Sequence, residues 1–90
     1  MSRYERIHTM LTQALSPCHL EIIDESHKHA GHSGAAPGGQ THYQLIIASQ
    51  QLEGLSKVKA HQKIYALLAG EFQTGLHALA IEIRPSHEPA

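Results

Sequence analysis

The 90-residue chain has little of several features that define whole classes of protein. It has a single cysteine, Cys18, so no disulfide can form within the chain, and a lone thiol favours a reducing compartment such as the cytoplasm. No apolar run approaches the roughly 20 residues of a membrane span, and the N-terminal residues contain no apolar signal core. These absences predict a soluble, cytoplasmic domain, although a chain trimmed of an organelle-targeting segment would have the same sequence.

The chain also lacks an excess of charge of either sign. Seven Lys and Arg residues face eight Asp and Glu residues, which gives a formal net charge of -1. No long-range attraction therefore draws the chain to nucleic acid or to an anionic membrane. No nucleophile with a base and an orienting acid, no phosphate-binding glycine loop and no paired carboxylates in a cleft can be recognised, so we predict that the chain is not an enzyme.

Histidine is the residue that the chain has in excess. Nine histidines stand against one Phe, three Tyr and no Trp. Imidazole changes its charge near neutral pH and is the commonest metal ligand among side chains. The functional chemistry is therefore expected at histidines.

A first helix is predicted at the N-terminus. Ser2-Arg3-Tyr4-Glu5 has the pattern of a capping box, in which a hydroxyl and a carboxylate satisfy free amides at a helix start. Arg3 and Arg6 fall outside the apolar stripe that follows, and Ser16-Pro17 ends the pattern. The stripe recurs at steps of three and four residues: Tyr4, Ile7, Met10 or Leu11, and Leu15.

Three segments have the alternation of strands. His19 to Asp24 and His42 to Ala48 predict a hairpin, with the glycine-rich residues 25–40 as a long loop at its tip. His77 to Ile83 alternates in the same way, and Pro85 ends it.

A second helix is predicted between the hairpin and the last strand. Ser56 can cap its start, and Gly70 is a plausible C-terminal cap, followed by a short helical turn at Glu71 to Gly75. The stripe expected to face the core is Val58, Ile64, Leu67 and Leu68.

The order α-β-β-α-(short helix)-β predicts a single small α+β domain. Its helices pack on one face of a three-stranded mixed sheet, and a crossover connection lets the third strand run parallel to a neighbour. We assign residues 1–84 to the domain and residues 85–90, which contain two prolines, to a flexible C-terminal tail.

Four motifs in this order and spacing carry a resemblance: Asp24-Glu25-Ser26-His27-Lys28-His29, Thr41-His42-Tyr43, His61-Gln62-Lys63-Ile64-Tyr65 and His77-Ala78-Leu79-Ala80. Over residues 1–84 the chain resembles the BolA-like family. The resemblance implies a fold related to the type II KH domain. It also implies a role as partner of monothiol glutaredoxins in handling [2Fe-2S] clusters, and some members of the family are transcriptional regulators.

The resemblance also implies a ligand set. In the mixed complex, the glutaredoxin side supplies its cysteine and a glutathione thiol, and the BolA side supplies a histidine near the start of the last strand plus a His or Cys in the hairpin loop. His77 matches the first position. His32 lies closest to the loop position, with His29 as its competitor, and no cysteine occurs between residues 25 and 42. The chain therefore looks like a histidine-type member.

Each of these histidines has a plainer interpretation. His77 shares the alternation phase of Leu79, which is typical of a partly buried histidine completing an apolar strand face. His29 and His32 can belong to a solvated loop that binds metals adventitiously. His61 lies on the second helix, where a structural role at the edge of the core is predicted.

The second helix suggests an alternative function. Lys57, Lys59 and Lys63 make it locally basic, which is typical of a solvated face, of a surface for a negatively charged partner, or of a nucleic-acid contact. A KH-like, nucleic-acid-binding regulator is therefore the rival hypothesis. The Gly-x-x-Gly loop that KH domains use is missing between helices, since Gly31-His32-Ser33-Gly34 lies in the hairpin loop.

Overall fold

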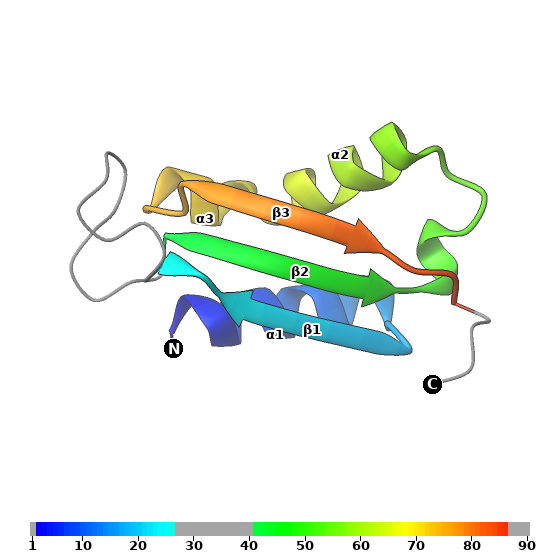
Figure 1. The fold of residues 1–90 in the computed structure, drawn as a ribbon, viewed down its shortest axis with the longest axis horizontal. Helices are drawn as coiled ribbons and strands as arrows, with labels where there is room; N and C mark the ends of the chain where they lie inside the picture. Colours follow the sequence, from blue (N-terminus) through cyan, green and yellow to red (C-terminus); the bar gives the residue numbers. More distant parts are fainter. Residues whose placement is uncertain (1, 27–40, 87–90) are drawn as a thin grey trace.

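A computed structural model describes residues 2–26 and 41–86 of the chain. Its elements follow the predicted order, and the first two strands have the predicted bounds (Figure 1). A short 3-10 helix after the second strand was not predicted. The elements are α1 (Arg3–Leu15), β1 (His19–Asp24), β2 (His42–Ala48), η2 (Gln50–Leu52), α2 (Lys57–Leu67), α3 (Ala69–Gln73) and β3 (Ala78–Ile83).

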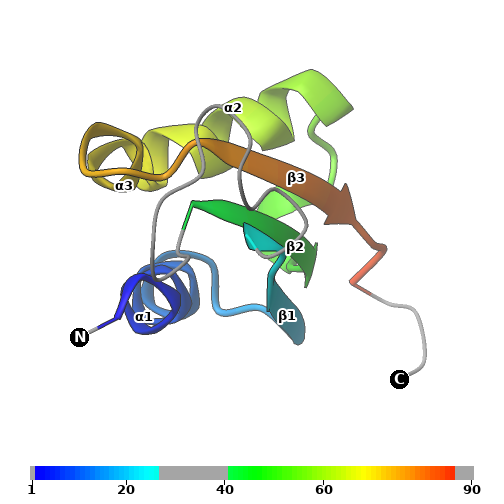
Figure 2. The same ribbon diagram turned by 60° about the vertical axis from the view of Figure 1, so that its left-hand side comes forward.

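The strands form one mixed sheet with the order β1-β2-β3. β1 runs antiparallel to β2, and β3 runs parallel to β2, with Leu45 opposite both Ile22 and Ile81. The segment from η2 to α3 is the crossover that a parallel pair needs. Figure 2 shows the helices on one side of the sheet, so the predicted α+β architecture is confirmed.

The core lies between the helices and one face of β2. Tyr43, Leu45 and Ile47 are buried there, as the alternation predicted. No helix of the described residues lies on the other sheet face, which is turned toward the viewer in Figure 1. The buried core cluster is Ile7, Leu11, Leu15, Tyr43, Leu45, Ile47, Leu52, Ala60, Ile64, Leu68, Leu76 and Leu79.

The predicted face of α1 is wrong at its first turn. The capping box of Ser2 and Glu5 is present, but Arg3 is buried and Tyr4 is 45% exposed. Arg3 is one turn before Ile7 and so lies on the same side of the helix. Its guanidinium can be buried there because it donates to Glu71 Oε1 at 2.8 Å, and Arg6 Nε donates to Oε2 of the same carboxylate at 2.9 Å.

The predicted face and end of the second helix also need correction. Val58 is 65% exposed, since it lies two residues before buried Ala60 and thus on nearly the opposite side of α2. Gly70 is not a C-terminal cap. α2 ends at Leu67 with Leu68 as its C-cap, whose N–H donates to Ile64 O, and Gly70 belongs to α3.

The C-terminal segment begins against the crossover. Ser86 N–H donates to Glu53 Oε1 at 2.9 Å. Residues 87–90 of the predicted tail lie outside the described residues. Over 2–26 and 41–86, no helix is long and apolar enough to cross a membrane.

Candidate functional site

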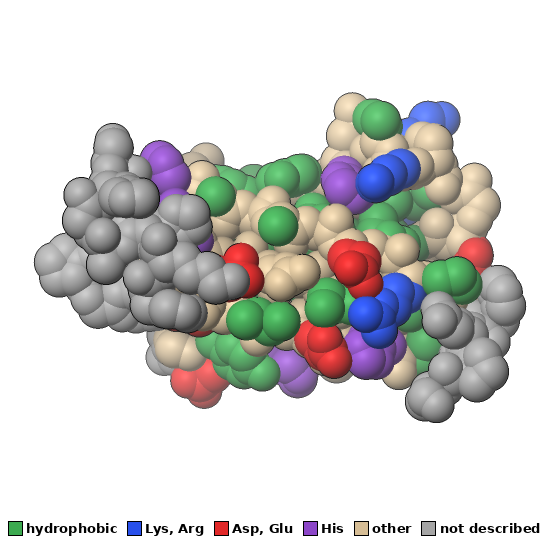
Figure 3. All heavy atoms as spheres, in the orientation of Figure 1, with side chains coloured by type: hydrophobic (Ala, Val, Ile, Leu, Met, Phe, Trp, Pro, Cys, Tyr) green, Lys and Arg blue, Asp and Glu red, His purple; other side chains and the backbone are tan. Residues whose placement is uncertain are grey.

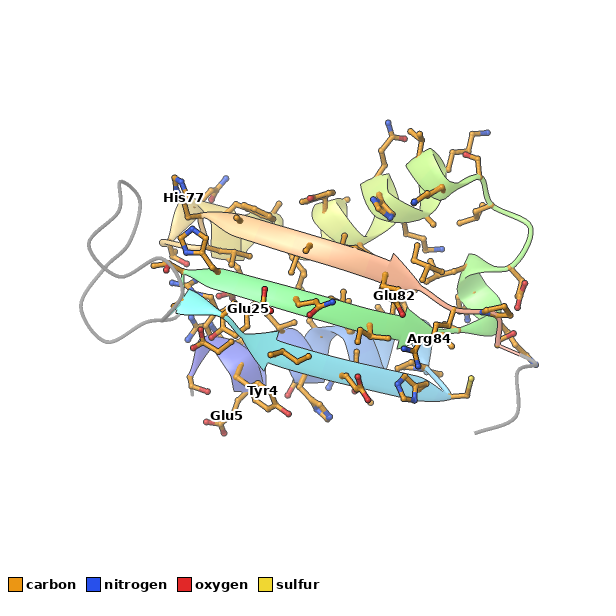
Figure 4. All side chains as sticks on the ribbon, in the orientation of Figure 1. Tyr4, Glu5, Glu25, His77, Glu82 and Arg84 are labelled. Carbon is orange, nitrogen blue, oxygen red and sulfur yellow. The ribbon has the colours of Figure 1, made fainter. Side chains whose placement is uncertain are left out.

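One end of the sheet gathers the start of β3, the start of β2 and the end of β1. The register pairs Asp24 with Tyr43 and His42 with Ala78, so three chain segments meet there. Residue 26, near the start of the predicted loop 25–40, and residue 41, directly after it, lie at this end as well. Figure 4 labels His77 at the same end, just before β3.

The backbone around His77 is held while its side chain is exposed. Its N–H donates to Thr41 O at 2.8 Å, and the N–H of Ala78 donates to the same oxygen at 3.1 Å. The interpretation of His77 as a partly buried residue is wrong, because the inward alternation begins only at Leu79. An exposed imidazole on a fixed backbone is suited to act as a preorganised ligand.

A second imidazole lies beside His77. The ring of His42 is centred 5.3 Å from the ring of His77 at an interplanar angle of 51°. His42 is buried, and its Nδ1 lies 2.8 Å from Thr41 Oγ1. The sequence placed His42 next to the loop but gave no sign of the contact with His77, because that contact depends on the β2–β3 register.

Ser26 fastens the two ends of the loop together. Its Oγ accepts the N–H of Thr41 at 2.9 Å and the N–H of His42 at 3.0 Å. Glu25 N–H donates to His42 O at 2.7 Å, which extends the β1–β2 ladder by one bond. The Ser26 hydroxyl therefore positions both residues that contact His77.

The mutation Ser26→Ala is expected to lower the free energy of unfolding by about 1–3 kcal/mol, since it removes the hydroxyl that accepts the buried N–H of Thr41 and that of His42. Urea unfolding followed by circular dichroism measures this loss. Ser56→Ala is the control, because that hydroxyl accepts only an exposed N–H, of Lys59, and removing a cap costs about 1 kcal/mol. Equal losses of unfolding free energy in the two variants would contradict this role of the Ser26 hydroxyl.

The phenol of Tyr43, near the start of β2, has a raised pKa. Burial raises the pKa of its phenol, and the nearby Asp24 carboxylate raises it further. The phenol therefore stays protonated at neutral pH.

Among the described residues, the predicted site residue His61 does not lie with His77. His29 and His32 lie outside the described residues. His61 is half-buried on α2, and its buried Nε2 has no hydrogen-bond partner among the described residues, so its structural role stays a prediction. Cys18 Sγ lies 3.5 Å from Ala48 O, at the opposite end of β2. Within 2–26 and 41–86, no group of three or more His, Cys, Asp or Glu residues comes together.

The three lysines of the rival hypothesis are exposed on α2. Ser56 caps this helix, and its first turn carries no acidic residue. Figure 3 shows basic side chains over α2, at the upper right. Lys57 also lines a groove beside β3.

Comparison with known proteins identifies the family. Residues 11–88 match the family model described as BolA-like protein. The chain belongs to the BolA-like family. The solved structure of BolA1 from Arabidopsis thaliana has the same fold as this BolA-like chain, with a TM-score of 0.86 and 39% identity over 99% of this chain and 98% of that one.

Two curated relatives extend the comparison. The chain is 45% identical over 84 residues to SufE-like protein 1, chloroplastic/mitochondrial, of Arabidopsis thaliana, covering 89% of this chain but only 23% of that protein. It is 35% identical over 77 residues to the DNA-binding transcriptional regulator BolA of Escherichia coli strain K12, covering 86% of this chain and 70% of that one. The BolA-like domain thus occurs both as most of a protein and as a small part of a longer one. The cytoplasmic location stays a prediction.

Proposed function

We propose that this BolA-like chain is a non-catalytic adaptor that binds a monothiol glutaredoxin and supplies histidine ligands to a bridging [2Fe-2S] cluster. The observation that carries the proposal is the exposed His77, held by its backbone at the end of the sheet where the hairpin loop begins and finishes. His77 is one ligand in this proposal. A loop histidine, His32 before His29, is the other.

The ligand chemistry supports this assignment. Imidazole nitrogen can replace thiolate on one iron of a [2Fe-2S] cluster, and two such replacements raise its reduction potential. The glutaredoxin would supply its cysteine and a bound glutathione thiol to the other iron. The ring of His42 is centred 5.3 Å from that of His77, so a second imidazole lies beside the proposed ligand.

In this proposal, His77 is held in place before the cluster binds, whereas the loop histidine takes its position in the complex. The hydrogen bonds to Thr41 fix the backbone of His77, so little ordering is needed there when the cluster binds. The loop ligand completes the coordination in the complex. Such a division favours the transfer of a cluster over its storage.

The proposal is tested by anaerobic reconstitution of the chain with a monothiol glutaredoxin, glutathione, iron and sulfide. We expect a heterodimer on gel filtration, with visible absorption and circular dichroism spectra that differ from those of the glutaredoxin homodimer. A glutaredoxin spectrum left unchanged by the chain, with no association, would overturn the proposal.

Nucleic-acid binding is the second candidate, favoured by the description of the Escherichia coli relative and by the exposed lysines of α2. Reversing the charge at Lys57, Lys59 and Lys63 separates the two functions. An adaptor keeps its cluster spectrum in this variant. A regulator loses its affinity for a double-stranded oligonucleotide, measured by fluorescence anisotropy at low salt.

A further inference from the structure

The outer edge of β3 has no strand beside it in the part of the chain that the structure describes. β3 pairs with β2 alone. The N–H groups of Ala78 and Arg84 point to β2, since they donate to Thr41 O at 3.1 Å and to Ile47 O at 2.8 Å. Because backbone groups alternate in direction along a strand, those of Leu79, Ile81 and Ile83 point outward.

Tyr65 of α2 closes the first part of this edge. Its hydroxyl donates to Leu79 O at 3.0 Å, and its ring packs against Phe72 with centroids 5.4 Å apart. The outward groups of Ile81 and Ile83 lie beyond this contact. These two residues are therefore the positions where a further strand can pair with β3.

A groove of about 660 Å³ runs beside these two residues. One wall is β3 together with Gln44 of β2, and the other comes from η2, the start of α2 and the segment between them. A smaller hollow of about 280 Å³ shares Leu52, Leu55 and Ile83 with it, so the two form one trough. The far wall of the groove consists of Leu52, Leu55, Lys57 and Ala60.

The far wall is positively charged at one point. Lys57 is the first residue of α2, and no acidic side chain occurs in the first turn to neutralise it or the helix dipole. On the β3 side, the carboxylate of Glu82 is engaged by Arg84 at 2.7 Å. A carboxylate entering the groove therefore meets an attractive charge at Lys57.

We propose that this groove binds an extended segment of a protein partner, which adds to β3 as a fourth strand. Its backbone pairs with the outward groups of Ile81 and Ile83, and its alternate apolar side chains pack on Leu52 and Leu55. A carboxylate of the segment lies beside Lys57.

An unpaired strand edge next to a helix selects an extended peptide, because main-chain hydrogen bonds supply affinity and alternate side chains supply specificity. The formal net charge of -1 gives no comparable preference for phosphates. The groove lies at the far half of β3 from His77, so the proposal does not depend on the adaptor function, and both sites can be occupied together.

A random library of peptides about eight residues long, displayed on phage, tests the proposal when it is selected on the full chain. We expect enriched sequences with apolar residues at alternate positions and one acidic residue. Their affinity, measured by titration of amide resonances, is expected to fall about tenfold in Lys57→Glu. Intermolecular contacts to the amides of Ile81 and Ile83 are expected in nuclear Overhauser spectra.

Lys63→Glu is the matched control, since it makes the same charge change on the same helix at an exposed residue outside the groove. It should leave peptide affinity unchanged. Ile81→Pro removes an outward N–H without touching the β2 ladder. Leu55→Ser alters an exposed wall residue and covers the case in which the proline variant fails to fold.

Several results would overturn the proposal. One is no enrichment over selection without the chain, and another is equal binding of the enriched peptides to wild type and Lys57→Glu. Binding of a single-stranded oligonucleotide that weakens equally in Lys57→Glu and Lys63→Glu would assign the groove to nucleic acid. Self-association abolished by Lys57→Glu would assign it to a second copy of the chain.

Discussion

Replacing His77 by alanine is expected to return the spectrum of the mixed complex to that of the glutaredoxin homodimer. The imidazole is one of the two ligands proposed for the chain, and alanine leaves that position on the iron without a donor atom. The substitution keeps the N–H that donates to Thr41 O. Because the side chain is exposed, the free energy of unfolding should change by no more than about 0.5 kcal/mol.

The expected loss is read from visible circular dichroism after anaerobic reconstitution. His8→Ala is the matched control, since His8 is also exposed and also lies beside one ring, that of Tyr4 at 6.3 Å, but on α1. His8→Ala should keep the wild-type spectrum. A His77→Ala spectrum identical to that of the wild-type complex would remove His77 from the coordination sphere.

Replacing Glu71 by alanine is expected to lower the free energy of unfolding by about 3 kcal/mol. The carboxylate joins α3 to α1, where it accepts hydrogen bonds from Arg3 and Arg6. Arg3 is 7% exposed and Glu71 is 6% exposed. Removing the anion leaves the Arg3 guanidinium buried without its counter-charge, and breaking a buried pair in this way costs about 3–5 kcal/mol.

Urea unfolding at neutral pH measures this effect without adding salt. Glu82→Ala is the control, because it breaks an exposed pair with Arg84, and such pairs contribute about 0–1 kcal/mol. Similar losses in the two variants would show that the Glu71 pair contributes no more than a surface pair.

The same carboxylate gives a pH dependence. The hydrogen bonds from Arg6 are the main cause that lowers the pKa of Glu71 in the folded state. A carboxyl with a lowered pKa stabilises the fold above its unfolded pKa of about 4.3, and this contribution is lost as pH falls through the folded value. The difference in stability between wild type and Glu71→Ala should therefore shrink below about pH 4. A difference that stays constant down to pH 3 would contradict this linkage.

The strands could be predicted from the sequence because one face of each is apolar. In β2, Tyr43, Leu45 and Ile47 alternate with His42, Gln44 and Ile46, and this period of two identified the strand. Both faces of β2 are largely buried, so the alternation predicted the direction of the side chains but not the burial of Ile46. Arg3 could not be assigned in the same way. Its burial depends on Glu71, which is 68 positions away in the chain, and no local pattern contains that partner.

Part of the candidate site could likewise be predicted from the sequence, and part depends on contacts between distant residues. The resemblance to the family pointed to His77, but its exposure and its contact with His42 required the parallel register of β2 and β3. The hydrogen bonds that the Ser26 hydroxyl accepts depend on the pairing of β1 with β2. Periodicity reports which side of an element is buried, whereas a site made from three strand ends depends on how those ends are paired.

The double hydrogen bond to the Thr41 carbonyl has a consequence for biosynthesis. His77 and Ala78 reach that oxygen only when β3, the last described strand to emerge from the ribosome, has docked beside β2. Parallel pairing across a long crossover forms late in folding, because the entropy of closing the intervening loop must be overcome first. A nascent chain that still lacks β3 therefore has no assembled pair of His42 and His77, and this end of the sheet is completed only with the last described strand.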